Sequence, residues 1–359
     1  MLTIIIESPN TKSRFKWLTR AVETRVSRVT LKGDSRRLRS DDSVNVVMIC
    51  FLFPGQSSWR AGVMGRACSL GDPSARVLDW ACEGLGRDLR IEDAEPMPRD
   101  NRHVQVGVVV TTLMHLAALE DAGLRAETSL GLSLGEYAHL RHVGALDDAS
   151  LLGLVDARGT EYDRGPSGKM VAVFPLDREE LEIAIRRALD GNGGVEIANV
   201  NSPTQHVIAG DSAAVDRVVE YLLREHYLET RTIEERVPMH TSTFEPVAYR
   251  FRRHLERAPF RAPRLVYRPN VTGSPMRGAS AADVVRCLTE HVHRPVQWRA
   301  SVEACVAEMP DVTFVEVGPG NILSNLLGRR WIKNRRLATD VGEDLRATFQ
   351  ATVGALRDA

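Results

Sequence analysis

The segment from Ala126 to Leu140 places a serine between a short apolar strand and a helix. Its first part, AETSLGLS, has the composition of a buried strand, and LGEYAHL begins a helix directly after Ser133. Gly131 and Gly135 flank this serine in a GxSxG pattern. Glycine is needed at such positions because larger side chains would crowd so tight a turn. A strand that passes through one serine into a helix predicts an α/β layer with an exposed hydroxyl.

This pattern makes Ser133 a candidate nucleophile. The N–H of Leu134 lies at the start of the predicted helix, where the helix dipole favours negative charge, so it can stabilise an oxyanion. Short combinations of glycine and serine also arise by chance, and the pattern alone fits an ordinary turn as well.

Apolar segments on both sides of the serine continue the α/β pattern. Residues 44–53 form a β-branched and apolar run that Pro54 and Gly55 end, which predicts a buried strand. Residues 103–123 are rich in Leu and Ala and close on a glycine, which predicts a largely buried helix. Strand and helix patterns alternate again near the C-terminus, through VTFVEVGPG.

A different texture occupies residues 168–236. KMVAVFPL and VEIANVNSPTQHVIAG predict strands, whereas REELEIAIRRAL and SAAVDRVVEYLLREHY have helical spacing. We expect a small α+β unit with two helices and a mostly antiparallel sheet, inserted into the main layer. The predicted core is therefore 46–167 with 237–345, and 346–359 form a C-terminal helix or tail.

Charge and cysteine content exclude several classes of protein. Lys plus Arg and Asp plus Glu both number 47, so no net charge favours nucleic acid or an anionic membrane. The 5 cysteines are odd in number and lack CxxC spacing, which argues against a disulfide framework and a zinc site. We found no apolar run of membrane-spanning length and no signal peptide, so we expect a cytoplasmic monomer.

Residues 1–45 are dense in Lys and Arg and have only a weak helical stripe. They fit a solvated or loosely docked extension, a basic arm that binds a partner, or a start codon assigned too early.

Five motifs in colinear order, from about residue 46 to residue 335, resemble one enzyme family. They are FLFPGQSSW, GLSLGE, ANVNSP, RVPMHTSTF and VEVGPGNILSNLL. Together they strongly resemble the malonyl-CoA:acyl carrier protein transacylases and the acyltransferase domains of polyketide synthases. The resemblance implies an α/β-hydrolase-like large subdomain with an inserted ferredoxin-like small subdomain.

The resemblance also assigns roles to matching residues. Ser133 would be the nucleophile and His240 the general base, in a ping-pong route through an acyl-serine. The backbone N–H groups of Gln56 and Leu134 would form the oxyanion hole. In HVHRPVQW, His291 stands where family members have a glutamine beside the carbonyl that orients the base, so the substitution is tolerated if that carbonyl does the orienting.

Substrate selection is assigned in the same way. Arg158, in VDARGTEY, matches the family arginine that pairs with the free carboxylate of malonyl groups, and a guanidinium fork suits a carboxylate. The alternative is a surface or helix-capping arginine. Tyr162 stands where a methionine commonly lines the acyl pocket, and Met239 stands where relatives use Ser or Phe, so the acyl group need not be standard.

The implied function is a cofactor-free transfer of a malonyl-type acyl group onto an acyl carrier protein, from an acyl-CoA or another carrier, in polyketide or fatty-acid biosynthesis. Acyl carrier proteins are acidic, so a basic cluster in GRRWIKNRR is a candidate docking site, with a solvated face as the alternative. This cluster comprises Arg329, Arg330, Lys333, Arg335 and Arg336.

Other readings remain open at this point. They are a carrier-to-carrier transferase for a non-standard acyl group, an acyl hydrolase that clears carriers, an esterase, and a scaffold with a dead site. An esterase needs an acidic residue between serine and histidine in the chain, and Asp211 is badly placed for this role. We interpret His115 as a core residue and His139 with His142 as chance spacing, so we expect no metal site.

Overall fold

A parallel sheet forms the centre of the computed structural model, which describes residues 47–98 and 100–358. The predicted extension 1–45 lies outside the described residues. The strand order is β2-β1-β7-β8, and every pair is parallel. The strands are β1 (Ile49–Phe53), β2 (Thr128–Gly131), β7 (Thr313–Glu316) and β8 (Arg336–Ala338).

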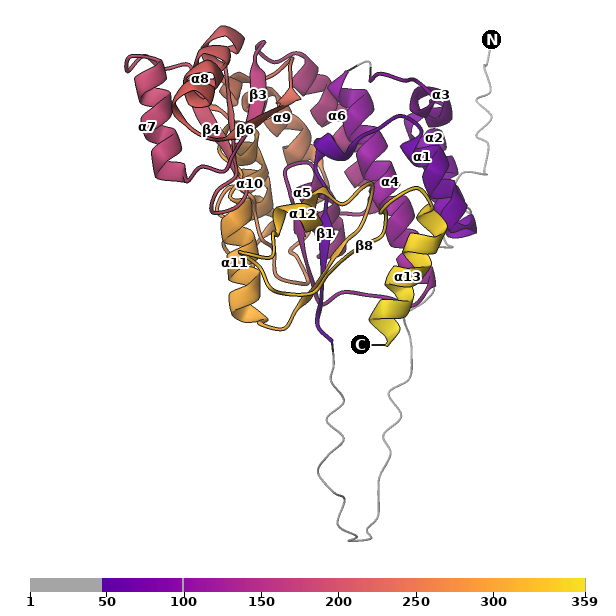
Figure 1. Cartoon of the computed structure of the whole chain (residues 1–359). Coiled ribbons are helices and arrows are strands. Elements are labelled where there is room, and N and C mark those ends of the chain that lie inside the picture. The colour runs from indigo at the N-terminus through magenta and orange to yellow at the C-terminus, as the bar shows by residue number, and fades with distance from the viewer. Residues whose placement is uncertain (1–46, 99, 359) are drawn as a thin grey trace, which may run out of the picture. The chain divides into compact units, whose positions relative to one another are not determined.

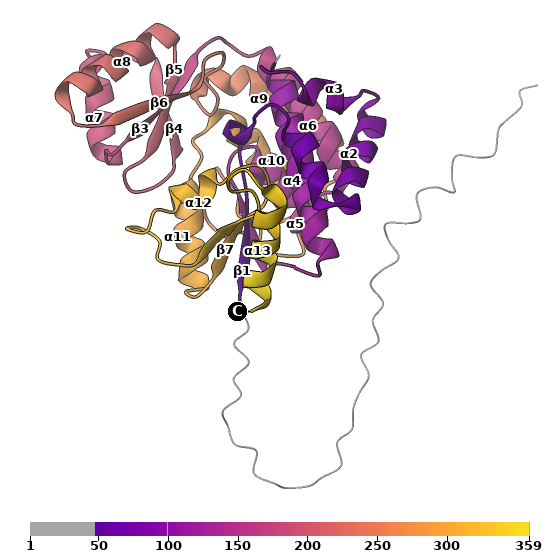
Figure 2. The same cartoon turned by 45° about the vertical axis from the view of Figure 1, so that its right-hand side comes forward.

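Helices cover both faces of this sheet (Figures 1 and 2). Outside the small sheet they are α1 (Val63–Ala67), α2 (Asp72–Leu85), α3 (Leu89–Asp93), α4 (Asn101–Asp121), α5 (Gly135–His142), α6 (Asp148–Asp163), α9 (Glu245–Arg257), α10 (Ala281–His293), α11 (Trp298–Glu308), α12 (Ile322–Leu326) and α13 (Leu345–Arg357). Phe51 and Phe53 of β1 share a core with α4 and α13, whereas Cys50 and Leu52 share one with α11 and α12. Strand β1 is therefore apolar at every position because both of its faces are buried.

Helix α4 lies inside the fold. It begins two residues before the predicted start, because the Asp100 side chain accepts the His103 N–H at 2.7 Å and caps the helix. Among the described residues, α4 alone is long and apolar enough to cross a membrane, but 89% of its apolar stretch is buried within the fold. A helix buried to this extent is a core helix of the fold.

The second sheet is antiparallel and has the order β4-β5-β3-β6. Its elements are β3 (Lys169–Phe174), α7 (Arg178–Ala188), β4 (Val195–Val200), β5 (His206–Gly210), α8 (Ser212–Glu225) and β6 (Glu229–Glu234). This βαββαβ order is ferredoxin-like, so the predicted fold class is confirmed, while the domain limits stay a prediction. We did not predict β6, whose sequence ETRTIE is mostly exposed and has no apolar alternation.

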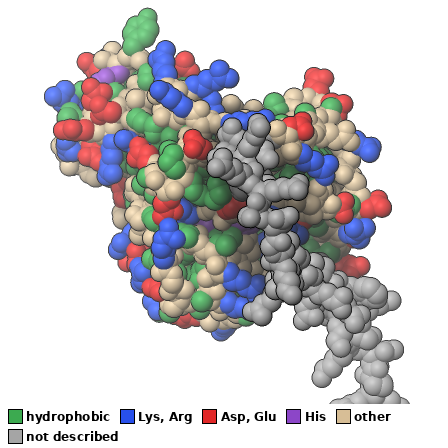
Figure 3. All heavy atoms as spheres, turned by 90° about the horizontal axis from the view of Figure 1, so that it is seen from below, with side chains coloured by type: hydrophobic (Ala, Val, Ile, Leu, Met, Phe, Trp, Pro, Cys, Tyr) green, Lys and Arg blue, Asp and Glu red, His purple; other side chains and the backbone are tan. Residues whose placement is uncertain are grey.

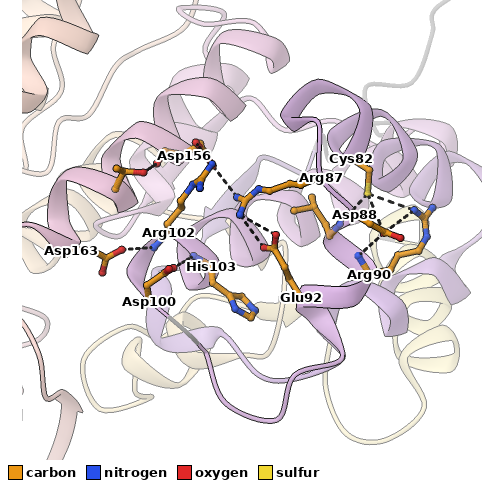
Figure 4. Close-up of polar contacts among 12 residues, drawn as sticks. Cys82, Arg87, Asp88, Arg90, Glu92, Asp100, Arg102, His103, Asp156 and Asp163 are labelled. Carbon is orange, nitrogen blue, oxygen red and sulfur yellow. Dashed lines mark hydrogen bonds and ion pairs between the residues drawn. The ribbon is translucent and has the colours of Figure 1, made fainter.

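A network of ion pairs joins α3, α4 and α6 (Figure 4). Arg87 and Arg102 both contact Asp156 of α6, at 2.8 and 2.7 Å. Asp163 accepts the backbone N–H of Asn101 at 2.8 Å. The two helices also come very close at Gly159, where a Cβ atom would lie 2.3 Å from the Arg102 Cα. This junction fixes the start of α4 and the middle of α6, which both reach the site described next.

Candidate active site

Ser133 lies at a strained turn between β2 and α5. Its φ of 51° is left-handed, which is uncommon for a residue other than glycine and marks a constrained site. Both flanking glycines are required by close backbone contacts. A Cβ on Gly131 would lie 2.1 Å from the Gly135 oxygen, and one on Gly135 would lie 2.0 Å from the Phe53 oxygen. The predicted tight turn between strand and helix is therefore present.

His240 meets Ser133 in hydrogen-bonding geometry, with Ser133 Oγ 2.8 Å from His240 Nε2. On the other side of the ring, Nδ1 lies 2.7 Å from the carbonyl oxygen of His291. A carbonyl only accepts, so Nδ1 carries the proton and Nε2 is free to accept the serine hydroxyl. His240 also has a positive φ, 63°. This contact contradicts a scaffold whose serine and histidine are far apart.

His291 orients the base through its main chain, as expected if a glutamine can be replaced at this position. Its ring also stacks on the His240 ring, with centroids 4.8 Å apart and 14° between planes. His291 Nδ1 lies 3.0 Å from Glu136 Oε2, and both side chains are buried. The acidic partner of an esterase triad is not Asp211, which instead caps α8 by accepting the Ala214 N–H at 3.0 Å.

Glu136 and Asn270 support the two catalytic residues, and the sequence reasoning missed both. Asn270 Oδ1 accepts the Ser133 N–H at 2.8 Å, and its Nδ2 donates to the Gly131 oxygen at 2.7 Å. Glu136 accepts the Asn270 N–H at 3.2 Å in addition to its contact with His291. A buried carboxylate one turn after the nucleophile was a usable signal, but the contact with Asn270 spans too much sequence to be predicted.

The environment of His240 lowers its pKa well below the usual value of 6.5. Burial is the largest cause, because it disfavours the charged ring. The His291 side chain and Arg158 act in the same direction, whereas the His291 carbonyl acts in the opposite direction. The ring is therefore neutral at neutral pH, as a general base must be before it accepts a proton.

Arg158 is fully buried on α6, with Nη2 at 3.5 Å from Ser133 Oγ. Its Nη1 has no hydrogen-bond partner among the described residues, and it forms no ion pair there. The guanidinium carbon lies 4.1 Å from the centroid of the Tyr162 ring. A surface or helix-capping position is thus wrong, and a buried cation without a carboxylate is costly unless an anion binds it.

A cavity of about 270 Å³ opens beside the serine, between the two sheets. Ser133, His240 and Met239 line it from the large subdomain. Asn199 and Arg231 are among the residues that line it from the small sheet. A serine and a neutral histidine in hydrogen-bonding geometry beside a cavity have the chemistry required for nucleophilic attack on a bound group.

The model of the family "Acyl transferase domain" matches residues 50–344. The chain belongs to this family. It is 30% identical over 299 residues to the malonyl CoA-acyl carrier protein transacylase of Bacillus subtilis, covering 81% of this chain and 92% of that protein. It is 33% identical over 289 residues to the polyketide biosynthesis protein ThaF of Burkholderia thailandensis, covering 79% of this chain and 24% of ThaF.

Solved structures agree with this assignment. The malonyl CoA-acyl carrier protein transacylase of Clostridium perfringens superposes with a TM-score of 0.78 at 28% identity, covering 87% of this chain and 98% of that chain. The Streptococcus pneumoniae MCAT gives a TM-score of 0.75 at 29% identity, covering 86% and 99%. The predicted family and fold are both confirmed.

The predicted oxyanion donors of this acyl transferase domain belong to two loops near the nucleophile. Leu134 follows Ser133 at the start of α5, and Gln56 lines the same cavity as Ser133. Neither N–H donates to another described residue. The loop approaches closely at Gly55, where a Cβ would lie 3.1 Å from the Leu132 oxygen. The geometry leaves both donors available.

Met239 and Tyr162 differ in their relation to the cavity. Met239 lines it directly, beside the base. Tyr162, like Arg158, is not among the residues that line it, so its contact with the acyl group stays a prediction. Its ring packs against the Arg158 guanidinium and, edge to face, against Phe244 at 5.1 Å. Tyr162 therefore supports the Arg158 guanidinium.

The predicted basic cluster follows α12, whose Leu323 and Leu326 line the cavity. Four of its members are exposed and have no ion pair among the described residues, namely Arg329, Arg330, Lys333 and Arg335. Arg336 was wrongly included: it is half-buried in β8, and its Nη1 donates to the Leu327 oxygen at 2.8 Å. On the face that Figure 3 shows, positive and negative side chains are interspersed, so steering depends on such local clusters.

The histidines at positions 115, 139 and 142 are packed within the fold. His139 and His142 both contact Ser129 Oγ, at 2.7 and 3.0 Å. His115 is buried against Thr339 at 2.9 Å, and burial lowers its pKa to about 4. The described residues contain no group of three or more His, Cys, Asp or Glu side chains that could hold a metal ion.

Proposed function

We propose that this chain transfers a malonyl-type acyl group, through an ester on Ser133, to the phosphopantetheine thiol of an acyl carrier protein. The observation that carries the proposal is Arg158, a buried cation without an anionic partner, 3.5 Å from the nucleophile. Relatives named malonyl CoA-acyl carrier protein transacylase, and polyketide biosynthesis proteins such as ThaF, support the same substrate and pathway class.

In the first half-reaction, Ser133 Oγ attacks the thioester carbonyl of the donor while His240 Nε2 takes the hydroxyl proton. The N–H groups of Gln56 and Leu134 stabilise the oxyanion of the tetrahedral intermediate. The intermediate collapses to the serine ester, and the leaving thiolate takes the proton back from His240.

In the second half-reaction, the carrier thiol enters the vacated position. His240 removes its proton, the thiolate attacks the ester carbonyl, and Ser133 leaves as the protonated alcohol. Arg158 holds the free carboxylate of the acyl group in both halves, because two parallel N–H bonds fix the orientation of a carboxylate. No cofactor or metal is needed for either half.

The carrier would approach the cavity along the exposed residues of the basic cluster, which begins three residues after α12. Four exposed cations without an ion pair among the described residues suit an acidic partner. A solved complex of a type II polyketide acyl carrier protein with its malonyl-transacylase supports this kind of partner. That structure is 24% identical to this chain and superposes with a TM-score of 0.76.

An acyl hydrolase on the same fold is the competing function, and Arg158 argues against it because a plain acyl chain offers this cation no anion. The test is to incubate the chain with malonyl-CoA, with and without a holo-carrier, and to follow both proteins by intact mass. We expect a malonyl adduct on the chain that moves to the carrier. Rapid release of free malonate with no loaded carrier would favour the hydrolase.

A further inference from the structure

The side chain of Gln56 is held from two separate parts of the fold. Its Nε2 donates to Asn101 Oδ1 and to Glu234 Oε2, at 3.2 Å each. Its Oε1 accepts from Gln105 Nε2 at 3.2 Å. Asn101 and Gln105 belong to α4, in the large subdomain. Glu234 is the last residue of β6, so it reaches Gln56 from the small sheet.

Glu234 is itself firmly fixed. Only 7% of its surface is exposed. Its Oε1 accepts the backbone N–H groups of Glu235 and Arg236, at 3.0 and 2.9 Å, and the Arg236 Nε at 3.1 Å. Hydrogen bonds to a carboxylate are roughly twice as strong as neutral ones. The other oxygen, Oε2, which also lies 3.5 Å from Arg236 Nη2, is therefore held in place as an acceptor for Gln56.

The backbone near Gln56 is short and depends on such anchors. Gln56–Ser58 form a single 3-10 turn, which Ser58 closes by donating its N–H and Oγ to the Gly55 oxygen at 3.2 and 2.7 Å. These bonds fix the shape of the turn, whereas the Gln56 side chain fixes where the turn lies relative to Ser133. An oxyanion donor accelerates a reaction only when it is already in place, within about 0.5 Å.

We propose that Glu234 is a positioning residue for the oxyanion hole. Its carboxylate holds the Gln56 side chain, so that the backbone N–H of Gln56 faces the carbonyl of the group bound to Ser133. The same strand carries Arg231, Thr232 and Ile233, which line the cavity. An acyl donor that contacts strand β6 can therefore affect where the Gln56 N–H lies. The inference rests on the proposed acyl transfer and adds to it a residue that touches neither substrate nor nucleophile.

The decisive variant is Glu234→Ala, measured by single-turnover formation of the acyl-serine. Loss of one oxyanion donor costs about 10²–10³-fold. A displaced donor retains part of its effect, so we expect the acylation rate constant to fall about 10- to 100-fold. The donor KM should change less than about twofold, because the oxyanion forms only after binding. A residue that merely stabilised the fold would instead lower the thermal midpoint and leave the rate of the folded fraction unchanged.

The matched control is Glu235→Ala, which removes the neighbouring exposed carboxylate and should acylate like wild type. The Gln56→Ala variant removes the other end of the contact. The double variant Gln56→Ala/Glu234→Ala should then cost no more than the more damaging single change, because both remove the same anchor. If Glu234→Ala does not fold, Glu234→Gln keeps the size and one acceptor, and a fall of about tenfold is expected.

Two results would overturn the inference. One is an acylation rate in a folded Glu234 variant equal to that of Glu235→Ala. The other is a double variant whose effect is the full product of the two single effects. Either leaves the proposed function standing, because that function is judged on the wild-type chain, by whether it forms a malonyl ester on Ser133 and passes the malonyl group to a carrier.

Discussion

The two walls of the cavity differ in how far the fold itself satisfies their polar groups. On the wall of the large subdomain, Ser133 and His240 are buried, have positive φ angles and are hydrogen-bonded to each other. On the wall of the small sheet, Arg231 and Thr232 lie exposed on the edge strand β6. The polar groups of the first wall are held in place by the fold itself, whereas those of the second wall are exposed and can bind a ligand.

This difference separates the chemical step from recognition. Strained, buried residues are maintained only where the surrounding fold determines them, so changes there should remove the acylation itself. Exposed residues at the opening should alter which partner is used and how fast it arrives. Glu234 is the exception, since it belongs to the open wall but contacts the loop of the oxyanion hole.

The largest effect should follow from Ser133→Ala in the fixed wall. Removal of the nucleophile leaves no atom to carry the acyl group, so the rate of transfer should fall at least about 10³-fold. The fold should be intact, because only a hydroxyl at the cavity is lost. Intact mass with malonyl-CoA checks the adduct and circular dichroism checks the fold. A full adduct on this variant would remove the serine from the mechanism.

Next in size is Arg158→Ala, which tests whether the buried cation selects the substrate. Truncation of one partner of a desolvated charge pair costs about 2–5 kcal/mol. At about 1.4 kcal/mol per tenfold, malonyl acylation should fall by about two orders of magnitude or more. Acetyl acylation should be equal or improved.

The matched control for that change is Arg164→Ala, since Arg164 lies at the end of the same helix and is exposed. It should retain the preference of the wild type. An equal loss for malonyl and acetyl donors in Arg158→Ala would show that the arginine serves the fold rather than the choice of substrate.

A smaller effect should appear in the pH dependence of acylation. His240 acts as base only when neutral, so activity is present above its pKa and is lost as the pH falls through it. Because burial holds this pKa well below 6.5, the acid limb should lie below pH 6.5. Single-turnover acylation at several pH values checks this, with folding monitored at each pH. A limb at or above pH 6.5 would mean that the ring is more hydrated than the structure indicates.

The smallest effect is expected at the exposed basic cluster. Charge reversal by Arg329→Glu/Arg330→Glu should slow transfer to an acidic carrier by several-fold to about tenfold and weaken its salt dependence. Self-acylation from malonyl-CoA should be unchanged. Arg186→Glu/Arg187→Glu is the control, because these exposed residues lie on α7 of the small sheet. Equal rates of transfer to the carrier in both double variants would show that the basic cluster is ordinary solvated surface.

The sequence predicted the elements whose patterns are local. Ser133 with its glycines, the buried strand β1 and the helices of the small unit follow from periodicity and turn chemistry within short windows. The contact between Ser133 and His240 was predicted from the resemblance of several motifs to one enzyme family, and not from local periodicity or turn chemistry. Strand β6 escaped prediction because it is polar and exposed, and its pairing with β3 supplies what its composition does not.

The residues that support the site could not be predicted for a different reason. Asn270 contacts Ser133 across 137 positions, and Glu234 contacts Gln56 across 178. A single polar residue has no periodic pattern that reveals a partner so far away. Arg336 could not be separated from its neighbours for a similar reason. It belongs to a dense run of basic residues, and nothing in the sequence indicates that its side chain is half-buried and donates to the backbone carbonyl of Leu327.

The most direct test of the central claim, that Ser133 accepts an acyl group selected by Arg158, is a competition for the nucleophile. The wild-type chain is mixed with equal concentrations of malonyl-CoA and acetyl-CoA, quenched before turnover is complete, digested and mapped by peptide mass. The account predicts that malonyl is the main adduct and that it lies on the peptide containing Ser133. A predominant acetyl adduct, an adduct on another residue, or no adduct at all would contradict it.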